Sequence, residues 1–340
     1  MPTEDRRAIL RLTIGTVGVF GLGLLLDWPL SFIGAVFTAL FLQAPAPMQI
    51  KVAAKLFLFA ILLMFGSWVV FSLLAPYPLV FLGAVALAIV LSFGWSIAGA
   101  GILPGVLALM AAMMIPNIIV QSKELALVLV AWIPGNLLIA GFASALSFTI
   151  IPAKPAAPGA AKPETPAPDF DPVRRLVRMS LVTVPFALAF FLFGWSALLV
   201  LFFVALLSQQ LAAMPAAGKK VAIGMLTANL LGAGIAVVFY EINVVAPSAM
   251  TAILLAVFLC VSLGTLSKSD HPLAPAAGSA LSTVLVVYGG SIAPFSDEAD
   301  VKSIIRVVQI GLSALIVIVS YMVVDEFLPE RRSTKLPGRT

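Results

Sequence analysis

Few residues of this chain have the types and spacing that enzyme chemistry requires. The sequence holds one histidine, His271, and one cysteine, Cys260. The single histidine excludes any site that needs two histidines. The single cysteine excludes a disulfide within the chain. The sequence also contains no phosphate-binding glycine loop, no paired-histidine metal motif and no G-x-S-x-G turn. We expect no catalytic residue, no metal and no cofactor, and we interpret the chain as a protein that is not an enzyme.

Two groups of glutamine and lysine flank helix-breaking residues and could attract an anion. In each group a glutamine precedes a proline-containing turn, and lysines follow at the start of the next apolar run. A helix N-terminus carries partial positive charge, so lysines beside it favour a negatively charged guest. Ordinary cytoplasmic turns with flanking lysines are the alternative interpretation. The candidate substrate-binding residues are Gln43, Lys51, Lys55, Gln210, Lys219 and Lys220.

Carboxylates that could couple transport to protons lie near the ends of apolar runs and not in the middle of them. Asp27, Glu241 and Asp325 are the candidates. Charge inside a membrane span usually marks function, and a proton-driven transporter usually carries an acid near the membrane midplane. Uncharged polar residues within the runs are expected to bond between helices rather than to line a path; they are Asn136, Thr183, Asn229, Thr283 and Gln309.

Composition and hydropathy predict that the chain spans a membrane many times. Hydrophobic residues make up 61% of the 340 residues, charged residues 10%, and the mean hydropathy is +1.13. A membrane-spanning helix needs about 20 apolar residues, and the runs are continuous rather than alternating, as helices require. We predict an all-α protein of about twelve spans, at 9–26, 30–43, 50–74, 78–93, 97–115, 124–151, 175–193, 196–213, 218–240, 247–266, 272–291 and 302–328. The fifth span of each half is predicted to be interrupted, by Pro104 and Gly105 in the first half and by Pro272 and Pro275 in the second.

Basic residues predict the orientation of the spans. If the N-terminus is inside, nearly all of the 20 lysines and arginines fall on the inner side of the membrane. The exceptions are Lys123, Lys302 and Arg306. Such a bias follows the positive-inside rule, so the basic pI of about 9.5 reports topology and not binding to nucleic acid. Both termini are expected in the cytoplasm of a bacterium, with the chain as a multi-pass protein of its inner membrane.

An offset of 167 residues superimposes the two halves of the chain. Arg11 falls on Arg178, Trp28 on Trp195 and Gln43 on Gln210. With six spans in each half, the repeat is parallel. We predict a six-helix repeat at 1–151, a Pro- and Ala-rich cytoplasmic linker at 152–172, a second six-helix repeat at 173–328 and a basic cytoplasmic tail at 329–340.

This order of features resembles the fusaric acid resistance and aromatic acid exporter family of inner-membrane proteins. The resemblance rests on the basic first helix, the tryptophan after it, and the Gln-Pro turn before a lysine-bearing third helix, from Gln43 to Lys55 and again from Gln210 to Lys220. It covers nearly all of both halves and is closest to a branch of undefined function. It implies efflux of aromatic or other weak organic acids, often with a periplasmic adaptor of the membrane-fusion type. The family's large cytoplasmic domains are replaced here by the linker 152–172 and a short tail.

We therefore expect an exporter of small organic anions in the bacterial inner membrane. Its partners would be the lipid bilayer, the anion and a periplasmic adaptor, with no nucleic acid. One alternative is a passive anion channel, which the lack of a midplane carboxylate favours. The other is a membrane subunit that transports nothing and partners an adaptor.

Overall fold

The structure is a computed structural model that describes residues 3–100, 102–153, 171–193, 204–205, 208, 218–292 and 302–328. Every regular element in these ranges is a helix. Nine of the described helices are long and apolar enough to cross a membrane. The prediction of an all-α, polytopic membrane protein is confirmed.

Six α-helices and one short π-helical segment form the first half of the chain. They are α1 (Thr3–Leu25), α2 (Ser31–Gln43), α3 (Ile50–Leu74), α4 (Pro78–Trp95), η1 (Ser96–Ala100), α5 (Ile102–Gln121) and α6 (Lys123–Ile150). The described helices of the second half are α7 (Pro172–Leu192), α9 (Gly218–Val245), α10 (Ala249–Ser267), α11 (Ala274–Ile292) and α12 (Lys302–Phe327). The predicted span 196–213 lies outside the described residues apart from Val204, Ala205 and Ser208, so the count of twelve stays a prediction. The linker 152–172 and the tail 329–340 also lie almost wholly outside the described residues.

The fifth helix is the element that differs most from its prediction of 97–115. The chain turns at Gly99, whose φ of 103° lies in the left-handed region that a glycine adopts without strain. The prediction of an interruption at Pro104 is wrong, because this proline sits in the first turn of α5, where its missing N–H has no partner to lose. The helix then continues through Pro116 to Gln121, as membrane helices tolerate. In α11 the predicted interruption at Pro275 is likewise absent, since the residue lies in the first turn.

Three helices form the interior of the molecule, and others present apolar faces outward. Nearly every residue of α2 is buried, as are the central parts of α5 and α11. By contrast α3, α4 and α10 expose large side chains such as Leu62, Leu87 and Phe258. In water such a surface would be unfavourable, but lipid tails are as apolar as leucine. The exposed apolar surface is therefore the part of the bundle that meets the bilayer.

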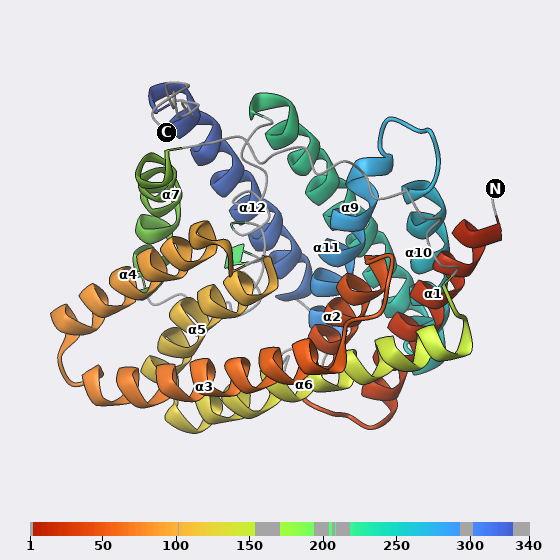
Figure 1. The fold of residues 1–340 in the computed structure, drawn as a ribbon, viewed down its shortest axis with the longest axis horizontal. Helices are drawn as coiled ribbons and strands as arrows, with labels where there is room; N and C mark the ends of the chain where they lie inside the picture. The colour runs from red at the N-terminus through yellow and green to blue at the C-terminus, as the bar shows by residue number, and fades with distance from the viewer. Residues whose placement is uncertain are drawn as a thin grey trace, which may run out of the picture.

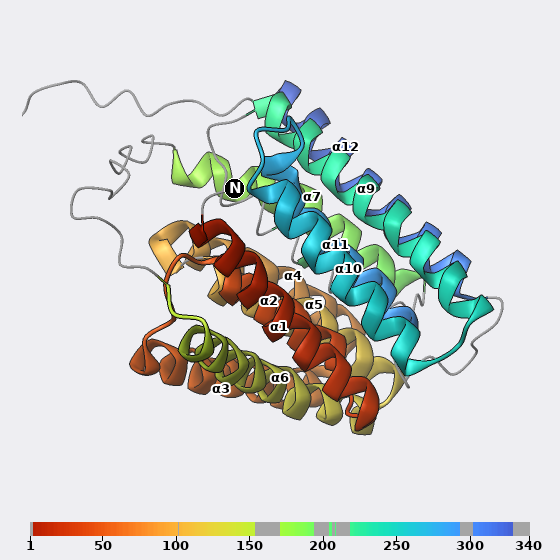
Figure 2. The same ribbon diagram turned by 90° about the vertical axis from the view of Figure 1, so that its right-hand side faces the viewer.

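The two halves of the chain lie side by side, and the helix pairs that join them correspond to each other under the repeat. In Figure 2 the first six helices (red to yellow-green) occupy one side, and α9 to α12 occupy the other. Helix α1 of the first half packs on α10 of the second, and α7, which begins the second half, packs on α4. Figure 1 shows the same neighbours, with α1 beside α10 at the right and α4 beside α7 at the left. The contacts within each half also correspond. In the first half α3 packs on α5 and α6, and in the second half the equivalent helix α9 packs on α11 and α12.

Candidate functional site

The predicted anion-binding residues of the first half lie at the junction of α2 and α3. Gln43 is the last residue of α2, and its Oε1 lies 2.6 Å from the point that a Cβ on Gly278 of α11 would occupy. Lys51 and Lys55 are exposed on the first turns of α3. The structure thus brings Gln43 against the second half and leaves the two lysines on the outside of the single chain.

The matching residues of the second half are described only in part. Lys219 and Lys220 lie in the first turn of α9, and their side chains lie outside the described residues. Gln210 lies outside the described residues altogether. The proposal that all six residues form one vestibule stays a prediction.

The three candidate proton carriers lie apart from one another. Asp27 is exposed in the turn between α1 and α2 and has a φ of 48°, a left-handed conformation that aspartate adopts more readily than most residues. Glu241 is exposed near the end of α9. Asp325 belongs to the last two turns of α12, and its side chain lies outside the described residues. The role of the three carboxylates in proton coupling stays a prediction.

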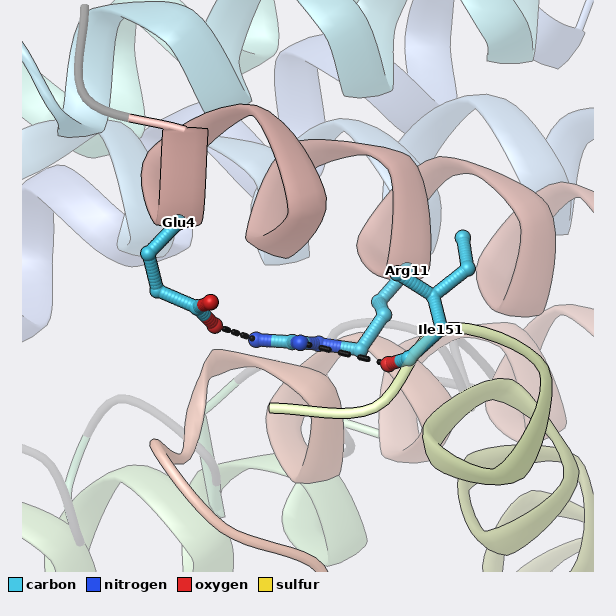
Figure 3. A network of polar contacts seen from close by, with 3 residues as sticks. All are labelled: Glu4, Arg11 and Ile151. Atoms are coloured by element: carbon cyan, nitrogen blue, oxygen red, sulfur yellow. Dashed lines mark hydrogen bonds and ion pairs between the residues drawn. The ribbon is translucent and has the colours of Figure 1, made fainter. Parts of the chain in front are cut away.

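A buried arginine lies near the start of α1 and joins this helix to the end of α6. Arg11 is 3% exposed, and its Nη2 donates to Glu4 Oε1 at 3.0 Å in an ion pair. Its Nη1 donates to the carbonyl of Ile151 at 3.3 Å, and the guanidinium lies 4.8 Å from the centre of the Phe148 ring. Figure 3 shows the guanidinium between the carboxylate and the carbonyl. Glu4 therefore offsets the charge of Arg11, which would otherwise be costly to bury.

Arg178 occupies the equivalent position on α7. The pattern Arg-x-Thr-x-x-Thr at Arg11 returns as Arg-x-Ser-x-x-Thr at Arg178, again at an offset of 167 residues. Arg178 is 9% exposed, and the last residue of the pattern, Thr183, is fully buried. The acid that corresponds to Glu4 is Asp171, but its Oδ1 accepts from the backbone amides of Val173 and Arg174 at 3.0 and 3.3 Å. This carboxylate caps α7, whereas Glu4 pairs with an arginine.

Three buried hydroxyl groups gather beyond Arg178 along α7; we call Thr183, Ser208 and Tyr321 the hydroxyl cluster. Thr183 Oγ1 and Ser208 Oγ lie 3.4 Å apart, and both residues are fully buried. The hydroxyl of Tyr321, on α12, lies next to both but makes no hydrogen bond of good geometry with the described residues. Arg178 lies five residues before Thr183 on the same helix. The cluster is rich in hydroxyl donors.

Other polar residues within the spans bond between elements, as the sequence predicts. Thr283 Oγ1 of α11 donates to Asn229 Oδ1 of α9 at 2.6 Å, and both residues are buried. Asn136 Nδ2 of α6 donates to the carbonyl of Pro29 at 3.2 Å, in the turn before α2. The side chain of Gln309 lies outside the described residues. These bonds join helices, and Asn136 Oδ1 is buried without a hydrogen-bond partner among the described residues.

The sequence places Arg11 and Arg178 among the inner basic residues and does not mark them as a site. Their burial depends on the approach of α6 and α12, which the sequence does not reveal. The repeated pattern of an arginine followed by two hydroxyl residues could have identified them. An arginine and hydroxyls that return at the same offset are a more specific sign of a site than a lysine after a turn.

Comparison with known proteins gives one similarity, and it covers the first half. Residues 8–145 match a family model described as "Protein of unknown function (DUF2955)". The matched segment runs from α1 into α6 and includes Arg11, Gln43, Lys51 and Lys55. No curated protein matches the chain, and no solved structure matches it. The first six helices are therefore similar to a family whose function is not known.

Proposed function

We propose that the protein exports small organic anions, such as aromatic carboxylates, from the bacterial cytoplasm across the inner membrane. The observation that carries this proposal is the pair of buried arginines at equivalent positions of α1 and α7. A charged side chain inside a membrane bundle is expensive, and in transporters such residues mark the path of the substrate. The buried guanidinium group of Arg178 and the buried hydroxyl donors further along α7 fit an anionic cargo.

Two further features support a transporter built of two repeats. The helix pairs of one half have counterparts in the other, since α4 packs on α5 as α10 packs on α11. The pairs that join the halves also correspond, α1 with α10 and α7 with α4. A path between two such repeats is a common arrangement in secondary transporters. The resemblance to fusaric acid resistance and aromatic acid exporters supports an organic acid as cargo, with a periplasmic adaptor as the partner.

The lysines at the starts of α3 and α9 are proposed to concentrate anions at the inner face. They lie at equivalent ends of equivalent helices, Lys51 and Lys55 on α3 and Lys219 and Lys220 on α9. Positive charge at a channel mouth raises the local concentration of an anion and falls in effect as salt is added. Replacing all four by glutamine is expected to lower anion flux severalfold at low ionic strength without lowering membrane abundance. Unchanged flux at low salt would remove the lysines from the mechanism.

The proposed function is tested by flux of a panel of aromatic carboxylates into proteoliposomes, with pH gradient and membrane potential imposed separately. Uptake that requires the pH gradient supports a coupled exporter. A passive anion channel is the second candidate, because the acids of the described spans lie near helix ends, as Glu4 and Glu241 do. Flux that follows potential alone favours the channel. No flux from folded protein would contradict both and favour a membrane subunit of an adaptor complex.

A further inference from the structure

We propose that the groove between α1 and α10 binds an acyl chain of a zwitterionic phospholipid, whose ammonium group lies at Asp27. The groove has a volume of about 380 Å³ and opens at the surface of the bundle. Its walls come from α1 of the first half and α10 of the second, which pack on each other and lie side by side in Figure 2. A lipid in this groove contacts both halves of the chain. Such a ligand is separate from the transported anion of the proposed function.

Two glycines of α1 give the groove its depth. Nothing lies within 4 Å of the position that a Cβ on Gly18 would occupy, so this part of the groove is open to a ligand. A Cβ on Gly21 would lie 3.2 Å from Cδ1 of Ile253 on α10, so the two helices meet at this level. The groove therefore results from missing side chains between helices that are in contact.

The lining of the groove fits an acyl chain and offers nothing to a polar ligand. Among the described residues that line it, Thr13 alone has a polar side chain, and its Oγ1 already donates to the carbonyl of Ile9 at 2.9 Å. The other lining residues are glycines and aliphatic residues. An acyl chain needs no hydrogen bond and gains dispersion contacts with such walls. Because the exposed apolar faces of the bundle meet the bilayer, the available apolar ligand is a lipid.

The length of the groove matches one leaflet of a bilayer. Thr13 and Leu25, the lining residues at its two ends on α1, lie twelve residues apart, which is about 18 Å along a helix. One leaflet is half of a hydrocarbon core that is about 30 Å thick. The groove begins near the middle of α1 and reaches the last residue of this helix. An acyl chain along it therefore places its headgroup just beyond Leu25.

The charge at the headgroup end of the groove is negative. Asp27 lies two residues beyond Leu25, is exposed, and makes no ion pair within the described residues. Arg6 and Arg7 on α1 and Lys268 after α10 are exposed at the opposite end of these two helices. A carboxylate at the headgroup end attracts an ammonium group and repels an anionic headgroup. The groove should therefore prefer phosphatidylethanolamine to phosphatidylglycerol.

Binding is tested with the purified full-length protein in detergent, by native mass spectrometry and by thermal unfolding. Phosphatidylethanolamine and phosphatidylglycerol with the same acyl chains are added in separate titrations. The wild type is expected to retain a phosphatidylethanolamine molecule and to unfold at a higher temperature in its presence, because a ligand of the folded state stabilises that state. Phosphatidylethanolamine should bind about threefold more tightly than phosphatidylglycerol, the effect of one exposed ion pair.

Two variants with matched controls test the two parts of the site. Gly18→Leu fills the groove and should abolish retention of the lipid, whereas Gly83→Leu should not, because Gly83 is an exposed glycine of α4 that also has nothing within 4 Å of its Cβ position. Asp27→Asn should remove the preference for phosphatidylethanolamine and keep the turn, since asparagine also adopts the left-handed conformation. Glu241→Gln removes an exposed acid of α9, which does not line the groove, and should keep the preference.

The outcomes distinguish the groove, the headgroup and a different occupant. Lipid retention that is unchanged in Gly18→Leu overturns the groove as the site. Equal affinity of the wild type for the two lipids, or a preference that is unchanged in Asp27→Asn, overturns recognition of the ammonium group; this test holds even where Gly18→Leu does not fold. A wild-type dimer that Gly18→Leu dissociates overturns the lipid in favour of a second copy of the chain.

Discussion

The side chain of Arg11 links α1 to the end of α6, so it contributes to the stability of both helices. Its guanidinium bonds Glu4 of its own helix and the carbonyl of Ile151 just beyond α6. Removing the carboxylate charge would leave the buried cation without its ion pair, which is unfavourable. Because Glu4 is 36% exposed, we expect Glu4→Gln to cost only about 1 kcal/mol of stability, measured by thermal unfolding in detergent.

Asp5→Asn is the matched control for this substitution. Asp5 is the neighbouring acid in the first turn of α1 and makes no ion pair within the described part of the chain. Both variants remove one negative charge from the helix start, where it interacts favourably with the helix dipole. A loss of stability that is equal in the two variants would show that the dipole, and not Arg11, accounts for the effect of Glu4.

Residue type alone identified some roles and not others. Asn229 and Thr283 were predicted to bond between helices because uncharged polar groups in a span have few other partners, and they do so at 2.6 Å. Lys51 and Lys55 are candidates because a lysine after a turn is visible in a sequence, yet both are exposed. The burial of Arg11 could not be predicted, since it depends on Glu4 and Ile151 meeting at one point.

At the scale of the helix, the close approach of α9 and α11 depends on a missing side chain. A Cβ added to Gly232 would lie 2.8 Å from Thr283 Cβ and 2.9 Å from the carbonyl oxygen of Ala280. The carbonyl belongs to the backbone of α11 and cannot rotate away, so the helices must separate. We expect Gly232→Ala to lower stability by about 2 kcal/mol, as overpacking of an interior does, and thermal unfolding in detergent checks this.

Substitution of Gly234, on the same helix, is expected to have the opposite effect on stability. It is exposed, and nothing lies within 4 Å of its Cβ position. Gly234→Ala should therefore be neutral or raise stability by up to about 1 kcal/mol, because alanine favours the helix. If the two variants shifted the unfolding temperature in the same direction by the same amount, helix propensity and not packing would decide the result.

Helix positions were largely predictable, because each run of apolar residues must cover the hydrophobic thickness of a bilayer. The start and end of α3 agree with the prediction of 50–74, and α12 differs from 302–328 by one residue. The sequence misplaces α5 because proline is the breaking residue most easily recognised in it. In the structure Pro104 and Pro116 both lie in α5, and Gly99 makes the turn. Which of several breaking residues acts depends on packing around it.

At the scale of the whole molecule, the positive-inside bias makes a prediction about which loops face the cytoplasm. Ala46, between α2 and α3, is expected inside, and Pro76, between α3 and α4, outside; both are exposed. The single native cysteine, Cys260, is buried, so cysteines introduced at these positions can be labelled against a low background. An impermeant thiol reagent added to intact cells should label Pro76→Cys and not Ala46→Cys. The reverse pattern would invert the topology and place the arginine-bearing ends of α1 and α7 outside.

The packing of the halves predicts that they assemble even when the linker is cut. Helix α1 packs on α10, α2 on α11 and α4 on α7, so each half is completed by the other. Fragments 1–160 and 161–340 produced together should copurify, whereas either fragment produced alone should accumulate poorly in the membrane. The linker contributes only effective concentration to this association, and the membrane already confines both fragments.

A substitution at the contact between the halves shows whether that packing drives the association. A Cβ on Gly289 of α11 would lie 2.6 Å from Phe32 Cβ of α2, whereas nothing lies within 4 Å of the Cβ position of Gly18 on α1. In lipid, helices associate through close packing rather than through the hydrophobic effect. Gly289→Ala should therefore reduce copurification of the fragments, and Gly18→Ala should leave it unchanged. Stable accumulation of fragment 1–160 alone, with unchanged copurification in Gly289→Ala, would mean that each six-helix half is an independent unit.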